Sequence, residues 1–480
     1  MAGSWNGLTY NGDATNENVT GTSADEWIIG RGGNDTLRGA GGNDQLDGGE
    51  GNDTLEGGDG NDTLSAAYFN NLGHGGGLDT LDGGAGDDDF FMERPQAGSR
   101  VIGGTGTDEL RMVFGESMAS AVTLSLTQAG SYMKIGSLDV MFVQTVEVLD
   151  LKLGAGNDNI TAGDGDDTLQ GWGGKDILRG GGGDDLLDGG DGADQLIGGT
   201  GDDTYFVTAG DIVTEADGEG TDRLSTPDSF SAAGQHIEVL SLYGPFDVNL
   251  TANHLNNEIR DNAGDNIIYA SGGDDIIWSG AGYDTLHGSS GNDTFYVQGM
   301  ADVVVEFSSG GLNDRIFTSR DFTLADNCYV EVLSDLNAAA TVLNGNKHAQ
   351  AIIGAGGADT IDGRGGSDTL TGGGGEDIFE FTRALGPTNV DTITDFSAAD
   401  DTIRLENFIF TQIVGIGTLS ANQFRANATG QAQDADDRII YETDSGRVFY
   451  DSNGNAAGGN FLFADLESGL AITNADFLIA

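Results

Sequence analysis

The chain has 480 residues, of which 82 are glycine, more than twice the usual share of about 7%. Asp and Glu total 78 against 20 Lys and Arg, so the formal net charge is -58. A chain this acidic repels phosphate backbones and anionic lipids, which excludes nucleic acid and direct membrane-surface binding. Hydrophobic residues still make up 37% of the chain, too many for a solvating disordered tail. We therefore expect a folded protein whose natural partners are cations.

The single cysteine and the N-terminus limit the class of protein further. Cys328 has no second cysteine to pair with, so an internal disulfide is excluded and a buried free thiol is expected. Residues 1–20 contain no basic stretch followed by an apolar core, so no cleavable export signal is visible there. No run of 18 apolar residues occurs, and we expect no transmembrane segment.

A nine-residue repeat dominates the chain and has the form Gly-Gly-x-Gly-x-Asp-x-apolar-x. It is clearest in residues 30–65, as GRGGNDTLR, GAGGNDQLD, GGEGNDTLE and GGDGNDTLS. A weaker unit with Glu26 precedes these. The acidic position recurs along the chain, most often at nine-residue spacing, at Asp35, Asp44, Asp53, Asp62, Asp79, Asp88, Asp108, Asp158, Asp167, Asp176, Asp185, Asp194, Asp203, Asp275, Asp284, Asp293, Asp359, Asp368 and Asp377. The same register places Asn257, Asn266 and Gln350 at acidic positions, where calcium binding is in doubt.

The repeats alternate with segments of strand-like composition. The expected organisation is an N-terminal segment (1–25), repeat arrays at 26–111, 154–206, 257–296 and 350–380, inserts at 112–153, 207–256 and 297–349, and a C-terminal β-rich cap at 381–480. Two inserts resemble each other, since GDIVTEADGEGTDRL parallels ADVVVEFSSGGLNDRI. Apolar and aromatic residues become denser from about Phe381, which indicates the cap.

The repeat predicts an all-β solenoid of stacked parallel strands. Each unit offers one short strand with a single inward apolar side chain, followed by a tight turn in which glycine supplies positive φ angles. One unit cannot bury a core, but stacked units align their Leu and Ile side chains into a continuous ladder. Successive turns then lie on opposite edges, so that Asp residues 18 apart stack about 4.8 Å from each other. Carboxylates at that spacing repel each other and require a cation.

Calcium fits this geometry best among the common metals. It accepts six to eight oxygen ligands from carboxylates and backbone carbonyls, whereas zinc prefers His or Cys and magnesium keeps much of its water. The alternative is a metal-free solenoid with a solvated acidic surface. Roughly 12 ions are expected from the pairs 18 residues apart. Turn glycines two residues before the acidic position join the Asp residues as candidate metal-site residues: Gly33, Gly42, Gly51, Gly60, Gly156, Gly165, Gly174, Gly183, Gly192, Gly201, Gly273, Gly282, Gly291, Gly357, Gly366 and Gly375.

These units resemble the glycine-rich nonapeptides of the RTX (repeats-in-toxin, hemolysin-type) family. The resemblance implies a parallel β-roll that binds calcium between turns. It also implies export from a Gram-negative bacterium by a type I secretion apparatus, with folding on external calcium. The segment DTITDFSAADDTIRL and the ending ADFLIA are similar to the C-terminal regions of such proteins, which carry an uncleaved secretion signal.

No catalytic motif accompanies the repeats. The five histidines are scattered, and the H-E-x-x-H, G-x-S-x-G and phosphate-loop motifs do not occur. We therefore expect a non-enzymatic extracellular calcium-binding protein of a surface layer, matrix or adhesin, which self-associates or contacts cell-surface polysaccharide. The alternatives are a secreted polysaccharide lyase or epimerase built on the inserts, and an RTX bacteriocin or toxin.

Overall fold

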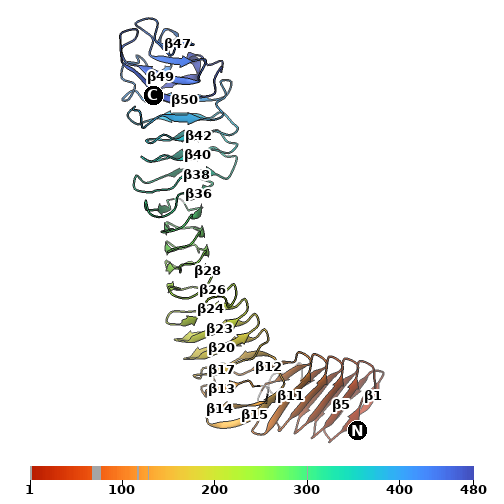
Figure 1. The fold of residues 1–480 in the computed structure, drawn as a ribbon. Coiled ribbons are helices and arrows are strands. Elements are labelled where there is room, and N and C mark those ends of the chain that lie inside the picture. The colour runs from red at the N-terminus through yellow and green to blue at the C-terminus, as the bar shows by residue number, and fades with distance from the viewer. Residues whose placement is uncertain (1–2, 67–76, 94, 116–117, 128, 300) are drawn as a thin grey trace. The chain divides into compact units, whose positions relative to one another are not determined.

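The computed structural model describes residues 3–66, 77–93, 95–115, 118–127, 129–299 and 301–480. Its regular structure is β-strand apart from two three-residue 3-10 helices, η1 (Ala421–Gln423) and η2 (Asn474–Asp476). The chain divides into two compact units, Met1–Ser241 and Leu242–Ala480. Within each unit the strands form a stack of short rungs (Figure 1). The predicted parallel β-solenoid is confirmed.

The first unit has two main sheets. One contains β1 (Ser4–Asn6), β2 (Thr9–Asn11), β4 (Trp27–Gly32), β6 (Gln45–Glu50), β8 (Thr63–Ser65), β10 (Asp89–Met92), β12 (Glu109–Val113), β16 (Val148–Lys152), β18 (Thr168–Gln170), β21 (Leu186–Asp188), β24 (Thr204–Phe206) and β26 (Arg223–Thr226). The other contains β3 (Asn18–Thr20), β5 (Thr36–Gly41), β7 (Thr54–Asp59), β9 (Thr80–Ala85), β11 (Ser99–Thr105), β15 (Leu138–Gln144), β14 (Ser131–Ile135), β13 (Val122–Ser125), β17 (Asn159–Thr161), β20 (Ile177–Gly182), β23 (Gln195–Thr200) and β25 (Ile212–Thr214). The short strands β19 (Gly173–Gly174), β22 (Asp191–Gly192), β27 (Phe230–Ser231) and β28 (Val239–Leu242) complete the series.

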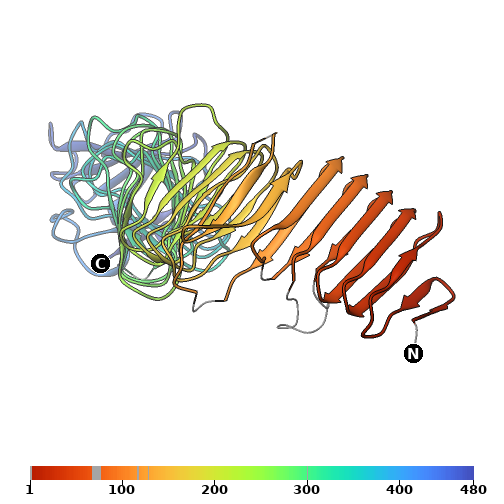
Figure 2. The same cartoon turned by 90° about the horizontal axis from the view of Figure 1, so that it is seen from below.

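The strand register follows from the nonapeptide. Strand β5 pairs in parallel with β7, with Leu37 opposite Leu55, because two nine-residue units make one full turn. Leu37, Leu46, Leu55 and Leu64 are fully buried and form the core. Tight turns separate the strands, and at Gly33 the turn takes φ 119°, which a side chain would disfavour. Figure 2 shows these parallel strands side by side near the N-terminus.

The first insert interrupts one sheet with antiparallel strands. Strands β13, β14 and β15 form an antiparallel meander, and it joins the parallel strand β11 on one side to β17 on the other. The following insert continues the solenoid instead, because β25 pairs in parallel with β23 and β26 with β24. The strand-rich inserts therefore contribute rungs to the stack.

The second unit repeats this architecture. One sheet contains β30 (Glu258–Arg260), β32 (Ile276–Trp278), β34 (Thr294–Val297), β36 (Arg315–Thr318), β38 (Val332–Asp335), β40 (Ala351–Ile353), β42 (Thr369–Thr371), β44 (Asp391–Ile393), β50 (Asn460–Asp465), β49 (Arg447–Asp451), β48 (Ile439–Glu442) and β47 (Phe424–Asn427). The facing strands are β29 (Asn249–Thr251), β31 (Ile267–Tyr269), β33 (Thr285–His287) and β35 (Val303–Val305), followed by β37 (Phe322–Thr323), β39 (Val342–Asn344), β41 (Thr360–Asp362), β43 (Ile378–Phe381), β45 (Thr402–Leu405), β51 (Phe477–Ile479) and β46 (Gly417–Thr418).

A β-rich cap closes the C-terminal end of this unit. Strand β50 pairs in parallel with β44 and antiparallel with β49, and β51 pairs with β45. Large side chains fill the cap, among them the fully buried Phe410 and Phe463, whose ring centroids lie 5.3 Å apart. The cap covers the edge that the last solenoid rungs would otherwise expose.

Two smaller expectations concern the cysteine and the membrane. Cys328 is a buried free cysteine, as predicted. In the described part of the chain, no helix is long and apolar enough to cross a membrane.

Candidate metal sites

The predicted Asp residues lie in the turns that precede the strands, along both edges of the solenoid. All 19 are buried, with exposed fractions between 0% and 5%. Each stands two residues before the inward apolar side chain of its unit, as Asp35 does before Leu37. This spacing holds every carboxylate at the edge of the core and away from solvent.

One oxygen of each carboxylate is bound by the neighbouring turn. The backbone N–H of Asp35 donates to Oδ1 of Asp53 at 2.8 Å, and that of Asp44 donates to Oδ1 of Asp62 at 2.7 Å. The same bond recurs 18 residues apart in the later arrays. We call this chain of bonds the carboxylate ladder. Stacked carboxylates were expected to face each other unscreened, but a backbone N–H partly offsets their repulsion.

In most of these residues the second oxygen has no hydrogen-bond partner within the part of the chain that the structure describes. It is buried and unpartnered in Asp35, Asp44, Asp53, Asp62, Asp88, Asp108, Asp158, Asp176, Asp185, Asp194, Asp203, Asp275, Asp284, Asp293 and Asp368. Of the other four, Oδ2 of Asp167 and Oδ2 of Asp359 accept long bonds of 3.4 and 3.3 Å, while Asp79 and Asp377 occupy ladder positions like the rest. A buried oxygen without a donor is costly, which fits a metal ligand.

The free oxygen faces a space that glycine keeps open. A Cβ on Gly30 would lie 2.2 Å from Oδ2 of Asp35 and 2.6 Å from the carbonyl oxygen of Gly48 on the next turn. Gly39 and Gly57 have the same surroundings. Calcium takes carboxylate and carbonyl oxygens at 2.3–2.6 Å. The residues present therefore fit calcium. We call the space between the free carboxylate oxygen and the carbonyl of the next turn the cradle, and in most units the first glycine lines it.

Burial makes ionised carboxylates unfavourable along the ladder. Burial raises the pKa of Asp35 from 3.8 to about 7. Burial together with the neighbouring Asp167 and Asp203 carboxylates raises the pKa of Asp185 to about 8. Bound cations would reverse this effect, because an opposite charge favours the ionised form.

The predicted turn glycines lie at the tips of the turns. Twelve of the 16 have positive φ, among them Gly51, where a Cβ would lie 1.5 Å from the carbonyl oxygen of Gly33. Gly156, Gly165, Gly192 and Gly357 do not have positive φ. These glycines permit close stacking of turns, whereas in most units the glycine nearest the free carboxylate oxygen is the first residue of the unit. Sequence reasoning did not single out that position.

The ladder also runs into the inserts and into the start of the cap. Its further acceptors are Glu147, Asp211, Asp222, Glu238, Asp302, Asp314, Glu331, Asp391 and Asp401. Most follow the preceding acidic residue at spacings of 16 to 24 instead of 18, because the turns differ in length. A search tolerant of such changes would have found them.

The amide residues in the acidic register behave differently. Nδ2 of Asn266 donates to Oδ1 of Asp261 at 2.6 Å, to Oδ1 of Asn262 at 2.8 Å and to the carbonyl of Gly264 at 3.0 Å. Nε2 of Gln350 donates to Oδ1 of Asn346 at 2.9 Å. An amide group thus supplies positive hydrogens among oxygens that a cation would otherwise bind. Asn257 accepts from Asn253 N at 3.4 Å.

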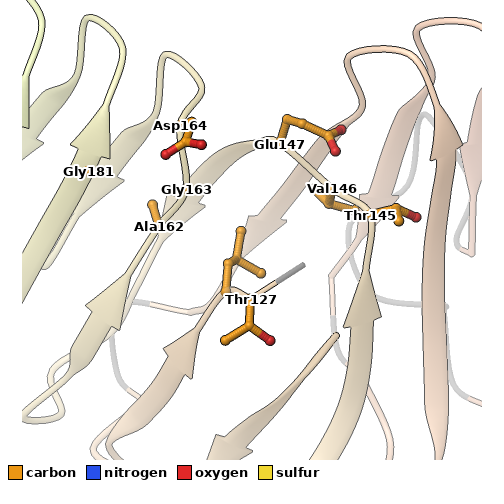
Figure 3. A pocket seen from close by; sticks show the side chains of 9 residues that line it. Thr127, Thr145, Val146, Glu147, Ala162, Gly163, Asp164 and Gly181 are labelled. Atoms are coloured by element: carbon orange, nitrogen blue, oxygen red, sulfur yellow. The ribbon is translucent and has the colours of Figure 1, made fainter. Parts of the chain in front are cut away.

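A cavity of about 680 Å³ lies where the first insert interrupts the solenoid, and its acidic lining residues are Glu147 and Asp164 (Figure 3). Figure 3 shows these two residues on different segments around the opening. Oε2 of Glu147 already accepts from Asp108 N at 3.1 Å, so this carboxylate belongs to the ladder. Among the nine lining residues there is no histidine, serine or cysteine.

His287, His348 and Trp278 are engaged in ring contacts elsewhere. His287 stacks on Tyr269 with centroids 4.4 Å apart, and His348 lies 4.1 Å from Tyr329. His74 lies outside the described residues. The faces of Trp278 are covered by Arg260 and Tyr296, which leaves no open ring face for a sugar.

The fold and the carboxylate ladder together define a class of protein: a parallel β-solenoid with buried, unpartnered carboxylate oxygens along its edges. Such oxygens suit the binding of hard cations. A family model for the RTX calcium-binding nonapeptide repeat matches residues 11–46, 20–55, 39–67, 153–187, 179–211, 255–286, 269–299 and 345–380. These segments of the chain are therefore RTX nonapeptide repeats, and this type of repeat binds calcium. No catalytic domain was identified, and no curated protein matches the chain.

Proposed function

We propose that this protein is an extracellular, non-enzymatic calcium-binding component of a bacterial surface layer, matrix or adhesin, which folds when it binds calcium after secretion. The observation that carries the proposal is the carboxylate ladder with its buried, unpartnered oxygens, which recurs in both units. The ladder occupies inserts as well as arrays, and this favours a structural role over a separate catalytic centre.

The proposed ligands are the predicted Asp residues together with backbone carbonyls of the turns. Roughly 12 ions would bind if each pair of stacked turns takes one. Ordering nine residues costs on the order of 1 to 2 kcal/mol each, while one buried Leu returns about 1.5 to 3 kcal/mol. Calcium binding to the folded form would supply the missing stabilisation.

A calcium titration followed by circular dichroism tests this function. We expect little β signal in excess chelator and a steep gain at millimolar calcium, because extracellular modules bind in the range of about 0.1 to 1 mM. Electron microscopy of the calcium-loaded protein then distinguishes ordered sheets or filaments from single particles. Full β signal in chelator would contradict calcium-dependent folding.

The enzyme alternative has a direct test. A polysaccharide lyase or epimerase would act on alginate or pectin in calcium, and turnover lost on changing Glu147 and Asp164 would locate the reaction in the cavity of Figure 3. No turnover on these polymers is expected under the proposed function.

Export by a type I secretion apparatus of a Gram-negative bacterium is part of the proposal. Residues 421–480 form the closing strands of the cap and, we infer, also carry the export signal. Appended to the C-terminus of an unrelated carrier, they should direct that carrier out of a cell that has such an apparatus. Retention of the fusion inside the cell would contradict the inference.

A further inference from the structure

Two glutamates from the inserts stand beside cradles of the repeat arrays. Glu215 directly follows β25, and the pairing of Ile197 with Thr214 places it next to Gly198 on the adjacent turn. Glu306 directly follows β35, and the pairing of His287 with Val305 places it next to Gly288. In an ordinary unit this neighbouring position is a glycine, as Gly48 is beside Gly30. Each glutamate therefore adds a carboxylate to the cradle.

In the first unit, Glu215 forms a compact group with Asp203 and Asp222. One carboxylate oxygen from each lies within 4.8 Å of the others, and all three residues are at least 96% buried. The described structure gives no hydrogen-bond partner to Oδ2 of Asp203, Oε2 of Glu215 or Oδ2 of Asp222. The other oxygen of Glu215 accepts from the Tyr205 hydroxyl, which itself accepts from Gly198 N at 2.6 Å.

In the second unit, Glu306 takes the corresponding place beside Asp293 and Asp314. A Cβ on Gly288 would lie 2.2 Å from Oδ2 of Asp293 and also 2.2 Å from Oε1 of Glu306. All three acidic residues are fully buried, and Oδ2 of Asp293 and Oε2 of Glu306 have no hydrogen-bond partner among the described residues. Oδ2 of Asp314 differs, because it accepts a long bond from Gly311 N at 3.3 Å. Gly288 N donates to Oε1 of Glu306 at 2.8 Å.

We propose that Asp203, Glu215 and Asp222 form a three-carboxylate calcium site, and that Asp293, Glu306 and Asp314 form a second. Buried carboxylates with unpartnered oxygens, three in the first group and two in the second, need a compensating positive charge. None of the ion pairs found among the described residues brings Lys, Arg or His to either group. A hard divalent cation accepts such a donor set.

These sites differ from the repeat sites in composition and in position. Glu215, Asp222, Glu306 and Asp314 lie outside the residues that the RTX repeat model matches. A comparable position after the fourth array holds Asp395, but its two oxygens accept from Gly372 N at 2.9 Å and Gly373 N at 2.8 Å. That carboxylate is satisfied by the backbone and is not included.

The additional carboxylate should make these two sites the tightest in the protein. Calcium affinity rises with the number of charged ligands, and each cradle here has three. The inference rests on the proposed calcium binding, since it ranks sites within the same solenoid. Each tight site would fix the junction between a repeat array and the insert that follows it, before the other turns are loaded.

Calcium binding to the full chain, measured against a competing chelator, tests the proposal. The variants are E215Q, E306Q and the double change, and Asp217→Asn is the matched control, because its side chain is 90% exposed and lies two residues from Glu215. We expect each single glutamine variant to lose one tightly bound ion, the double variant to lose two, and the control to lose none. The glutamine amide should satisfy the cradle as Asn266 does, so full β signal at saturating calcium is expected.

Each remaining outcome has one meaning. Unchanged tight binding in both glutamine variants would overturn the three-carboxylate sites while leaving calcium-dependent folding intact. A wild-type chain that takes up no calcium at all would overturn the proposed function itself. If a glutamine variant fails to reach full β signal, Glu215→Asp provides the second test, since it keeps the charge and should retain the tight ion.

Discussion

The two oxygens of a ladder carboxylate make different interactions. Oδ1 of Asp185 accepts from Asp167 N at 2.7 Å and so ties two turns together, while its Oδ2 remains available to a cation. An alanine at such a position removes both interactions, whereas an asparagine preserves the first. Substitutions at the ladder can therefore separate the structural contribution of the side chain from its contribution to metal binding.

Replacing Asp185 with Ala should raise the calcium concentration needed for folding. One lost ion costs about 1.4 kcal/mol when calcium is ten times its Kd, and the lost hydrogen bond adds about 1 kcal/mol. Circular dichroism during a calcium titration measures the shift. Asp217→Ala removes an exposed carboxylate and should leave the midpoint unchanged; equal shifts in the two variants would mean that only net charge matters.

The amide of Asn266 offers the converse experiment. Asn266→Asp places a carboxylate next to Asp261, whose pKa burial already raises to about 8. We expect the variant to be less stable than wild type in chelator and to bind one more calcium ion at saturation. Asn266→Ala is the control, because it loses the three amide hydrogen bonds without creating a ligand. An Asp variant that binds no additional calcium would show that this cradle cannot hold the ion.

At the scale of elements, the buried Asp carboxylates along one edge of the solenoid titrate as a group. In the ion-free fold, burial raises the pKa of Asp62 and Asp167 to about 7 and that of Asp275 to about 9, against 3.8 when unperturbed. A raised folded-state pKa means that the folded chain binds protons more tightly than the unfolded chain between those values. The stabilisation by protons is therefore complete below about pH 4 and is lost as pH rises through 6 to 9.

The calcium-free protein should consequently gain β-structure on acidification. Circular dichroism of the calcium-depleted chain from pH 8 to pH 5 is expected to show increasing β signal, since protons replace cations as the neutralising partner. In saturating calcium the signal should change far less over the same range. Equal β signal at pH 8 and pH 5 without calcium would contradict the inference that protons stabilise the fold by neutralising these buried carboxylates.

The sequence predicted the rungs well where the nonapeptide is regular. Leu37 and Asp35 occupy the core and the edge as their spacing requires, because strand period and turn length are both contained in nine residues. Glu215 and Glu306 escaped prediction, since they follow strands whose turns no longer obey the repeat. The bond from Asp35 N to Asp53 was also missed, because it depends on the stacking offset between turns, which a one-dimensional pattern does not contain.

For each unit as a whole, the arrays and inserts form one continuous stack. The stack in the second unit ends in a cap whose strands β50 and β51 pair with the last rungs β44 and β45. Because every rung contacts mainly its neighbours, stability should spread along the stack by nearest-neighbour coupling. Cations bound at the junctions between arrays and inserts would then couple the stability of an array to that of the insert that follows it, although the two differ in sequence composition.

The carboxylate ladder also makes each unit a line charge. Ladder residues on one edge recur at the rung spacing of about 4.8 Å, which is shorter than the distance of about 7 Å at which two charges in water interact with thermal energy. A line charged this densely condenses monovalent counterions, as nucleic acids do, and calcium must displace them. Sodium chloride should therefore weaken calcium binding and also stabilise the calcium-free fold by screening. We expect the stabilisation given by a fixed calcium concentration to shrink steadily as sodium chloride rises, with thermal unfolding as the measurement. A stabilisation independent of salt would mean that the ladder holds its ions one site at a time, without a shared ionic atmosphere.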